Sequence, residues 1–284
     1  MTNKIIALVD GSIYSQSVCE HAAWVAERTG WAVELLHVLG RREGVETADY
    51  SGSIALGART ALLEELAELD AQRARLVSHR GRAILEDARA ILDRAGINEI
   101  TTRLRHGDIV DTVAAQEAEA EMILIGKRGE AADFAKGHLG SNLERIVRAS
   151  KKPVFVAARA FKPIVRVLVA YDGGASAMRA VDHIARMSLY QGLDVHLVSV
   201  GTATAELNRG LEDARAMLRA AGIEATAEVI AGQPETTLGA LVGEAGYDML
   251  VMGAYGHSRI RSMIIGSTTT EMIRSCKVPV VLTR

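Results

Sequence analysis

Each half of this chain carries a glycine pattern whose spacing could hold a phosphate chain. The pattern Gly-x-x-Gly-(9 or 10)-Gly-Ser comprises Gly126, Gly129, Gly140 and Ser141 in the first half, and Gly253, Gly256, Gly266 and Ser267, followed by Thr268, in the second. Glycine lets the backbone approach a phosphate closely. The free N–H groups at a helix start, joined by a serine or threonine hydroxyl, bind anions. The sequence therefore predicts two sites for the phosphates of a nucleotide.

The two glycine loops differ in their charged residues: the second is basic, and the first carries both signs. The second loop is basic and has no acidic residue between its last two glycines; its charged residues are His257, Arg259 and Arg261. The first loop is one residue longer and mixes both signs, with Lys127, Arg128, Glu130, Asp133 and Lys136. Because basic side chains favour a negatively charged triphosphate, we expect the second half to be the stronger phosphate site.

The two patterns belong to a repeat that spans nearly the whole chain. The run IIALVDGS at the start is matched by RVLVAYDGG, so that Asp10 and Asp172 are 162 residues apart, as are Val38 and Val200. From the third apolar run onward the spacing falls to about 126, which gives the first half roughly 36 additional residues. We expect a first domain at 1–160, with an insertion at about 41–76, and a second domain at 164–284.

Short apolar runs alternate with helical patterns in both halves. The expected strands are 5–9, 33–38, 99–105, 122–126 and 153–158 in the first half, and 166–171, 194–200, 224–230, 249–253 and 279–284 in the second. Near-continuous apolar strands separated by helices are typical of an α/β fold with a parallel sheet covered on both faces. Leucine and alanine at helical spacing predict a long amphipathic helix at 58–92. We interpret these extra residues as a structural addition; the alternative is that the Gly/Ser/Ala stretch before the helix, around 50–57, forms a lid or a contact surface.

Composition narrows the class of protein. The formal net charge of -2 gives no electrostatic argument for binding nucleic acid or an anionic membrane. No segment reaches the roughly 18 apolar residues of a membrane span, and the sequence enters its first strand without a signal peptide pattern. Its two cysteines, Cys19 and Cys276, are not at equivalent positions and have no metal-ligand spacing. We therefore expect a cytoplasmic protein.

Both halves resemble the universal stress protein family. The resemblance rests on the aspartate of VDGS and YDGG, the HV or SV that ends the second strand, Gly107 and the Gly232-Gln-Pro sequence, and the glycine pattern before a Pro-Val strand. It implies two tandem five-stranded parallel sheets of order 3-2-1-4-5, with helices on both faces. One branch of the family binds ATP. In such a sheet, ligands bind at the carboxyl ends of the strands where the strand order reverses.

The resemblance also assigns roles to residues. It implies that Asp172 and Val200 lie at the adenine or ribose of a nucleotide in the second half, and that the glycine pattern surrounds the phosphates. Asp10 and Val38 take the same roles in the first half. Mg²⁺ is expected with the ATP phosphates, and no metal-ligand set of the protein itself is expected.

The function expected from these features is regulatory. We expect an ATP-binding stress regulator whose nucleotide state alters its contacts with a partner; the alternative is a nucleotide-free scaffold that keeps the fold. A dinucleotide oxidoreductase would require G-x-G-x-x-G after the first strand, and a Walker-type ATPase G-x(4)-G-K-[ST]; neither motif is present. Slow ATP hydrolysis is left open, but no positioned general base is evident, so we expect no catalytic residue and no enzyme.

The fifth strands predict how the halves assemble. PVFVAA and PVVLTR are apolar and, in the order that the resemblance implies, lie at open sheet edges. Such edges pair unless they are blocked. We expect the two strands to pair antiparallel within one chain about a pseudo-twofold axis, as in the dimers of the family. A further homodimer, through a surface such as the long helix, is left open.

Overall fold

The computed structural model describes residues 3–40, 56–129, 140–254 and 266–284. All ten expected strands are present, each within one residue of its predicted bounds. They are β1 Lys4–Leu8, β2 Ala32–Leu39, β3 Ile100–His106, β4 Met122–Gly126 and β5 Val154–Ala157, then β6 Arg166–Ala170, β7 Asp194–Val200, β8 Ala225–Ile230, β9 Met249–Gly253 and β10 Val280–Thr283.

The ten strands form one sheet in the order β3-β2-β1-β4-β5-β10-β9-β6-β7-β8. Within each half all strands are parallel and follow the predicted order 3-2-1-4-5. At the seam β5 and β10 run antiparallel, with Phe155 opposite Val281. The predicted pairing of the two fifth strands is therefore confirmed, and it removes one open edge from each half.

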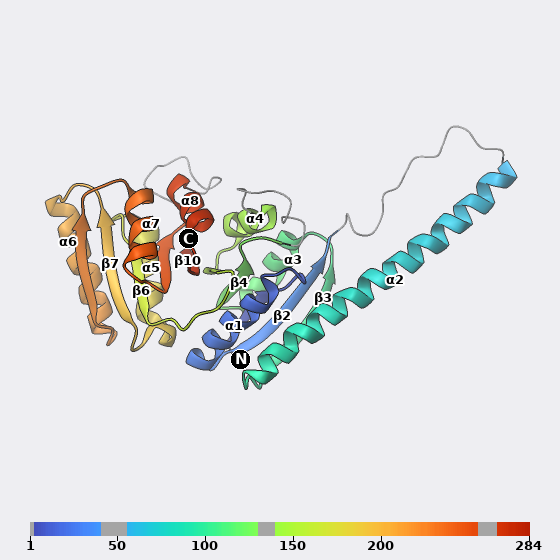
Figure 1. The fold of residues 1–284 in the computed structure, drawn as a ribbon, viewed down its shortest axis with the longest axis horizontal. Helices are drawn as coiled ribbons and strands as arrows, with labels where there is room; N and C mark the ends of the chain where they lie inside the picture. Colours follow the sequence, from blue (N-terminus) through green and yellow to red (C-terminus); the bar gives the residue numbers. More distant parts are fainter. Residues whose placement is uncertain (1–2, 41–55, 130–139, 255–265) are drawn as a thin grey trace.

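Helices cover both faces of this sheet (Figure 1). One face carries α1 Ser15–Thr29, α2 Leu56–Arg94, α5 Ala175–Arg186 and α6 Ala205–Ala220. The other carries α3 Ile109–Gln116, α4 Ser141–Ala149, α7 Pro234–Glu244 and α8 Ser267–Ser275. Single turns of 3-10 helix lie at η2 Glu117–Glu119 and η4 Ser188–Tyr190. Each face has one hydrophobic core with residues from both halves, so the two halves pack as a continuous layered unit.

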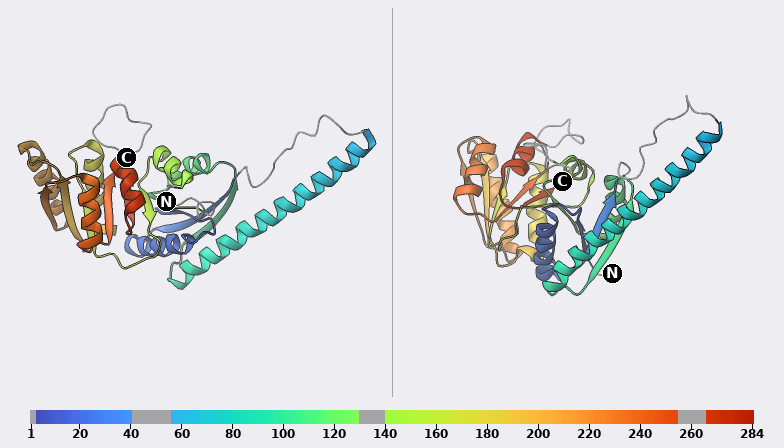
Figure 2. Two further views of the ribbon diagram at one scale, coloured as in Figure 1. Left: turned by 45° about the horizontal axis from the view of Figure 1, so that its top comes forward. Right: turned by 45° about the vertical axis from the view of Figure 1, so that its right-hand side comes forward.

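The helix α2 confirms the predicted long helix but is only partly packed. It has 39 residues, whereas α6, its counterpart in the second half, has 16. Its C-terminal part packs on α1, β2 and β3 through Leu85 and Leu92, which are buried. Its N-terminal part projects away from the rest of the molecule (Figures 1 and 2). Among the described residues no helix, α2 included, is long and apolar enough to cross a membrane.

Polar contacts reinforce the seam on both faces of the sheet. On one face Arg28 Nε donates a hydrogen bond to Leu189 O over 2.7 Å, and Ser188 Oγ donates to Arg28 O over 3.2 Å. On the other face Arg284 Nη1 donates to Arg148 O over 2.9 Å. The two halves are therefore held together by side chains as well as by the β5–β10 ladder.

Candidate functional site

In the second half, the predicted site residues meet where the strand order reverses, between β6 and β9. Ala170 and Met252 are paired neighbours in these parallel strands, so Asp172 and Gly253 follow at adjacent carboxyl ends. Gly266 N lies 3.4 Å from Ala254 O, which returns the chain to the end of β9 just before α8 begins. The structure thus brings Asp172, Gly253 and the start of α8 to one edge of the sheet.

Gly253 is required by packing at this edge. A Cβ atom on Gly253 would lie 2.6 Å from Ser176 Oγ, 2.8 Å from Ser176 Cβ and 3.0 Å from its carbonyl carbon. These distances are too short for any side chain, because the first turn of α5 sits directly on the end of β9. The glycine therefore has a structural reason that is independent of any ligand.

The start of α8 leaves backbone N–H groups available to an anion. Gly266 is the N-cap residue and, having no side chain, makes no capping hydrogen bond. Ser267 is exposed, but Thr268 Oγ1 donates to Glu235 Oε1 over 2.7 Å. That hydrogen bond lowers the pKa of Glu235, so its carboxylate is ionised at neutral pH beside α8. The backbone and Ser267, more than the Thr268 hydroxyl, are thus the groups suited to phosphate oxygens.

Val200 ends β7 beside a pocket of about 370 Å³. The pocket is lined by Gly201, Thr202, Ala203, Val229, Ala231 and Gly232. The side chain of Val200 approaches Gly232, with Cγ1 3.9 Å from where a Cβ of that glycine would lie. The volume of the pocket falls within the range of small-molecule pockets. Asp172 and Gly253 do not line it, so it is separate from the phosphate edge and borders only the predicted adenine side.

Three predicted residues of this site, Gly256, His257 and Arg259, lie outside the described residues.

The first half repeats the arrangement at the ends of β1 and β4. Gly140 N lies 3.3 Å from Lys127 O, which brings the start of α4 and the exposed Ser141 back to Gly126 at the end of β4. Val38 lies partly buried in β2, opposite Arg105 of β3. The structure therefore brings together the predicted residues that it describes in this half as well.

The aspartate of the first half is tied into its own loop. Asp10 Oδ1 accepts hydrogen bonds from Ser12 N over 3.0 Å and from Ser15 Oγ over 3.2 Å. A Cβ on Gly129 would lie 2.8 Å from Asp10 Oδ2. The Asp10 carboxylate thus lies directly against the glycine loop.

The side chain of Lys127 is not available to bind a phosphate in the first glycine loop. Its side chain is 8% exposed, and its Nζ donates to the backbone oxygen of Cys276 across the seam. Burial lowers the pKa of this ammonium to about 8. The basic residue nearest to Gly126 in the sequence is therefore committed to joining the two halves.

Sequence reasoning also missed the side chains that face Gly126 and Gly253, which we call the inner glycines. Tyr14 lies at Gly126, where a Cβ would come within 2.7 Å of Tyr14 Cβ, and Ser176 lies at Gly253. These residues are 162 apart, like Asp10 and Asp172, and the same spacing places Ala177 where the first half has Ser15. The repeat spacing was the signal that could have identified them.

Comparison with known proteins supports the fold and its duplication. The family model of the universal stress protein family matches residues 1–158 and 201–284. Universal stress protein Slr1230 of Synechocystis sp. is 36% identical over 285 residues, which cover 99% of both chains. Universal stress protein Rv1996 of Mycobacterium tuberculosis is 26% identical over 318 residues, which cover 99% of this chain and 94% of that protein. The crystal structure of a universal stress protein from Archaeoglobus fulgidus superimposes with a TM-score of 0.74 at 23% identity, covering 100% of this chain and 99% of that one.

Proposed function

Because the chain belongs to the universal stress protein family and carries its domain twice, we propose that it is a stress-response regulator whose second half binds ATP. The nucleotide state then alters the contacts of the protein with a partner. The observation that carries this proposal is the convergence of Asp172, Gly253 and the start of α8 at the reversal of the strand order. We also propose that residues 1–160 and 164–284 are the two domains.

The proposed roles follow from position. The N–H groups that open α8 after Gly266 bind phosphate oxygens, with the hydroxyl of Ser267 beside them. Asp172 binds a ribose hydroxyl, and Val200 with the neighbouring pocket receives the adenine. His257 and Arg259 supply positive charge to the phosphates from the loop outside the described residues. The arrangement holds and orients a nucleotide, and we propose no catalytic role for it.

Glu235 indicates the form in which ATP binds. Its ionised carboxylate, 2.7 Å from Thr268 Oγ1, lies beside the proposed phosphate site. A bare triphosphate would be repelled there, whereas the Mg²⁺ complex carries less negative charge. The described residues contain no cluster of side chains that could hold a metal ion by themselves. We therefore propose that Mg²⁺ arrives with the nucleotide.

The first half is proposed to bind ATP weakly or not at all. The first glycine loop contains Glu130 and Asp133, and Lys127 is turned into the seam. Both features reduce the attraction of this cleft for a triphosphate, since one adds negative charge and the other removes positive charge.

Two matched substitutions test the assignment. Gly266 and Gly140 both precede a helix at similar φ values, -58° and -57°, which a β-branched residue can adopt. We expect Gly266→Val to weaken binding of Mg-ATP by at least about tenfold in calorimetry, or about 1.4 kcal/mol. Gly140→Val serves as the control and should leave this affinity unchanged; because its Cβ would lie 3.3 Å from Lys127 O, circular dichroism should first show that it is folded. Parent-like affinity of a folded Gly266→Val protein would show that the phosphates bind elsewhere.

A nucleotide-free scaffold is the second candidate function. The observation in its favour is that Ser176 and Tyr14 alone explain why Gly253 and Gly126 lack side chains. A scaffold would bind no ATP even at saturating Mg-ATP, so the calorimetric experiment on the parent protein distinguishes the two functions.

A further inference from the structure

The projecting part of α2 carries leucines at coiled-coil spacing. Leu62, Leu69 and Leu76 are seven residues apart, and Leu66 lies between the first two. Leu69 is 54% exposed and Leu76 is 72% exposed, although both are large apolar side chains. We call these four leucines the leucine stripe. A seven-residue apolar repeat on a helix is the pattern that packs against another helix.

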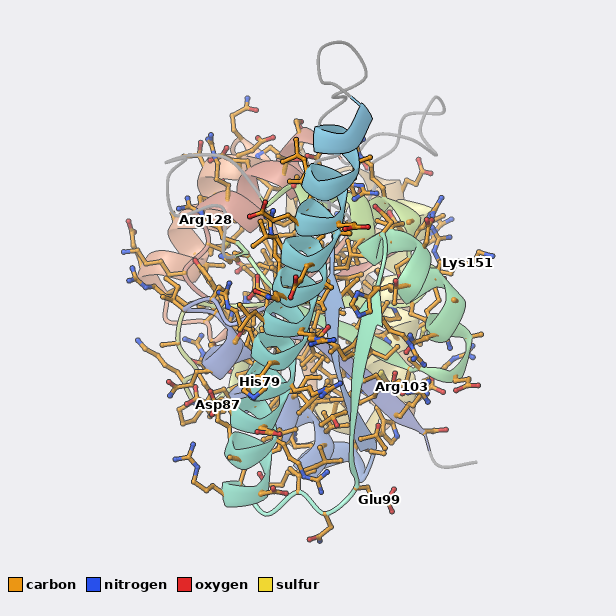
Figure 3. All side chains as sticks on the ribbon, turned by 90° about the vertical axis from the view of Figure 1, so that its right-hand side faces the viewer. His79, Asp87, Glu99, Arg103, Arg128 and Lys151 are labelled. Atoms are coloured by element: carbon orange, nitrogen blue, oxygen red, sulfur yellow. The ribbon has the colours of Figure 1, made fainter. Side chains whose placement is uncertain are left out.

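The body of the protein does not cover this stripe. α2 contacts the sheet at Gly81, where a Cβ would lie 2.8 Å from Leu104 and 3.0 Å from His37, whereas residues 71–76 are all exposed. Side-on, α2 runs beside β3 and continues beyond the sheet, with His79 and Asp87 labelled on the helix (Figure 3). Most of the stability of a helix in a protein comes from packing of its apolar face, so an additional packing partner would stabilise the projecting part of α2.

The charges beside the stripe are segregated along the helix. The acidic segment, residues 64–70, contains Glu64, Glu65, Glu68 and Asp70 and no basic residue. The basic segment, residues 73–82, contains Arg73, Arg75, Arg80 and Arg82, with His79, and no acidic residue. Within the described part of the chain, the four carboxylates and the side chains of Arg73 and Arg75 make no ion pair.

This order of charges has a simpler partial explanation. Acidic residues toward the N-terminus and basic residues toward the C-terminus of a helix complement its macrodipole. That effect decays within the terminal turns, however, and it gives no reason for leucines every seven residues, of which Leu69 and Leu76 are exposed. The combination of the leucine stripe with the two segments therefore calls for a partner of complementary charge.

We propose that α2 pairs antiparallel with α2 of a second copy of this chain. In this orientation the acidic segment of each copy faces the basic segment of the other, whereas a parallel pair would place like charges together. The pair is centred near residue 71, which sets Leu66 of one copy opposite Leu76 of the other. Arg73 interrupts the stripe, and a polar residue at such a position lowers affinity while fixing the register.

The pairing leaves the rest of the fold unchanged. The seam between β5 and β10 already satisfies the fifth strands within one chain, so the helix pair is a second, separate interface. It places the two bodies at opposite ends of the helix pair. Pairing through α2 does not require a bound nucleotide.

Charge reversal in the full-length chain tests the proposal by sedimentation velocity. We expect the parent to be a dimer at micromolar concentration. Two double variants, Glu65→Lys with Glu68→Lys and Arg73→Glu with Arg75→Glu, should each raise the dissociation constant at least tenfold. An equimolar mixture of the two variants should restore dimers, as should a single chain that carries all four changes. Far-UV circular dichroism should show that every variant remains folded, since all four positions are exposed.

Three results would overturn the proposal. A parent that stays monomeric at about 100 µM would show that α2 does not pair with itself at relevant strength. Dimers that persist in both double variants would place the interface on another surface. Variants that become monomeric but do not associate when mixed would show that charge pairing between copies is not the cause.

Disulfide crosslinking tests the orientation. A chain with both Leu66→Cys and Leu76→Cys should crosslink between copies, whereas either single variant should not, because each position faces the other and not itself. The native cysteines, Cys19 and Cys276, are buried and do not compete. Efficient crosslinking of both single variants would show parallel pairing and contradict the proposal.

Discussion

The two halves share one backbone plan and differ in a few side chains at the same edge of the sheet. The inner glycine faces Tyr14 in the first half and Ser176 in the second. Where the first half has Ser15 bonded to its aspartate, the second has Ala177. A duplicated domain can thus keep its strand order while the chemistry of one copy changes.

The first half has also taken on contacts that the second lacks. Lys127 crosses the seam to Cys276, while the residue after Gly253 is Ala254, which has no side chain long enough to do so. The long helix α2 is likewise a feature of the first half alone. We infer from this difference that the first half serves contacts across the seam and the helix pairing that we propose, whereas the proposed nucleotide site belongs to the second half.

The largest expected effect tests a feature that the two halves share, the close packing of a neighbouring residue on the inner glycine. Gly253→Ala should lower the free energy of unfolding by about 3 kcal/mol, because its Cβ would overlap the backbone and side chain of Ser176. Gly126→Ala should be similarly costly because of Tyr14. Chemical denaturation measures both. Gly239→Ala in α7 is the control: nothing lies within 4 Å of its added Cβ, so it should stabilise by about 0.5–1 kcal/mol. A Gly253→Ala protein of parent stability would contradict the packing.

Acid should destabilise both halves through equivalent histidines. Burial lowers the pKa of His21 and of His183, which are 162 residues apart, to about 4 from 6.5. The unfolded chain therefore binds protons between pH 6.5 and 4 that the folded chain does not. Stability is present above pH 6.5 and falls as the pH drops through this window, by about 2–3 kcal/mol for each histidine.

Denaturant titrations of the parent, His21→Phe and His183→Phe between pH 7 and 4 measure this loss. Each variant should lose part of the pH dependence, and the exposed His79→Gln control should lose none. An unchanged slope in both phenylalanine variants would mean that these histidines are not buried in neutral form.

A smaller effect in base tests the difference between the halves. The pKa of Lys127 falls from 10.5 to about 8 because the ammonium is buried. The unfolded chain holds this proton at pH values where the folded chain has released it, so stability from this residue rises as the pH increases from 8 to 10.5.

Comparison with Lys127→Met isolates that contribution from other groups that titrate in base. Relative to the variant, the parent should gain about 1–3 kcal/mol between pH 8 and 10.5, measured by denaturation. If the two proteins changed in parallel over this range, Lys127 would be solvent-exposed and free to serve the first cleft.

The smallest expected effect concerns the loop of Asp10. Ser15 Oγ accepts hydrogen bonds from Asp10 N at 3.2 Å and Gly11 N at 2.9 Å, and donates to the Asp10 carboxylate. Ser15→Ala should lower the free energy of unfolding by about 1 kcal/mol. The reverse change at the matching position, Ala177→Ser, should cost less than this. Equal costs at both positions would mean that the two loops do not differ as described.

The strands and their order could be predicted from the sequence because each strand is a local apolar run and because the same pattern occurs in both halves. Runs such as MILIG and MLVMG are apolar on both faces, and the seam followed from the apolar edges of β5 and β10. Lys127 and Thr268 were not predictable in the same way. Both stand beside a glycine pattern that suggests phosphate, yet one side chain bonds Cys276 and the other Glu235. Their directions depend on residues distant in the sequence, which only the packed structure brings near.

The central claim is that the strong nucleotide site lies in the second half, and counting bound ATP tests it most directly. Native mass spectrometry of the purified protein, equilibrated with Mg-ATP, should show one nucleotide for each chain. The Gly266→Val protein should show a much lower occupancy under the same conditions, while Gly140→Val should retain one nucleotide. Two equally occupied sites in the parent, or a single nucleotide that is lost only from Gly140→Val, would contradict the account.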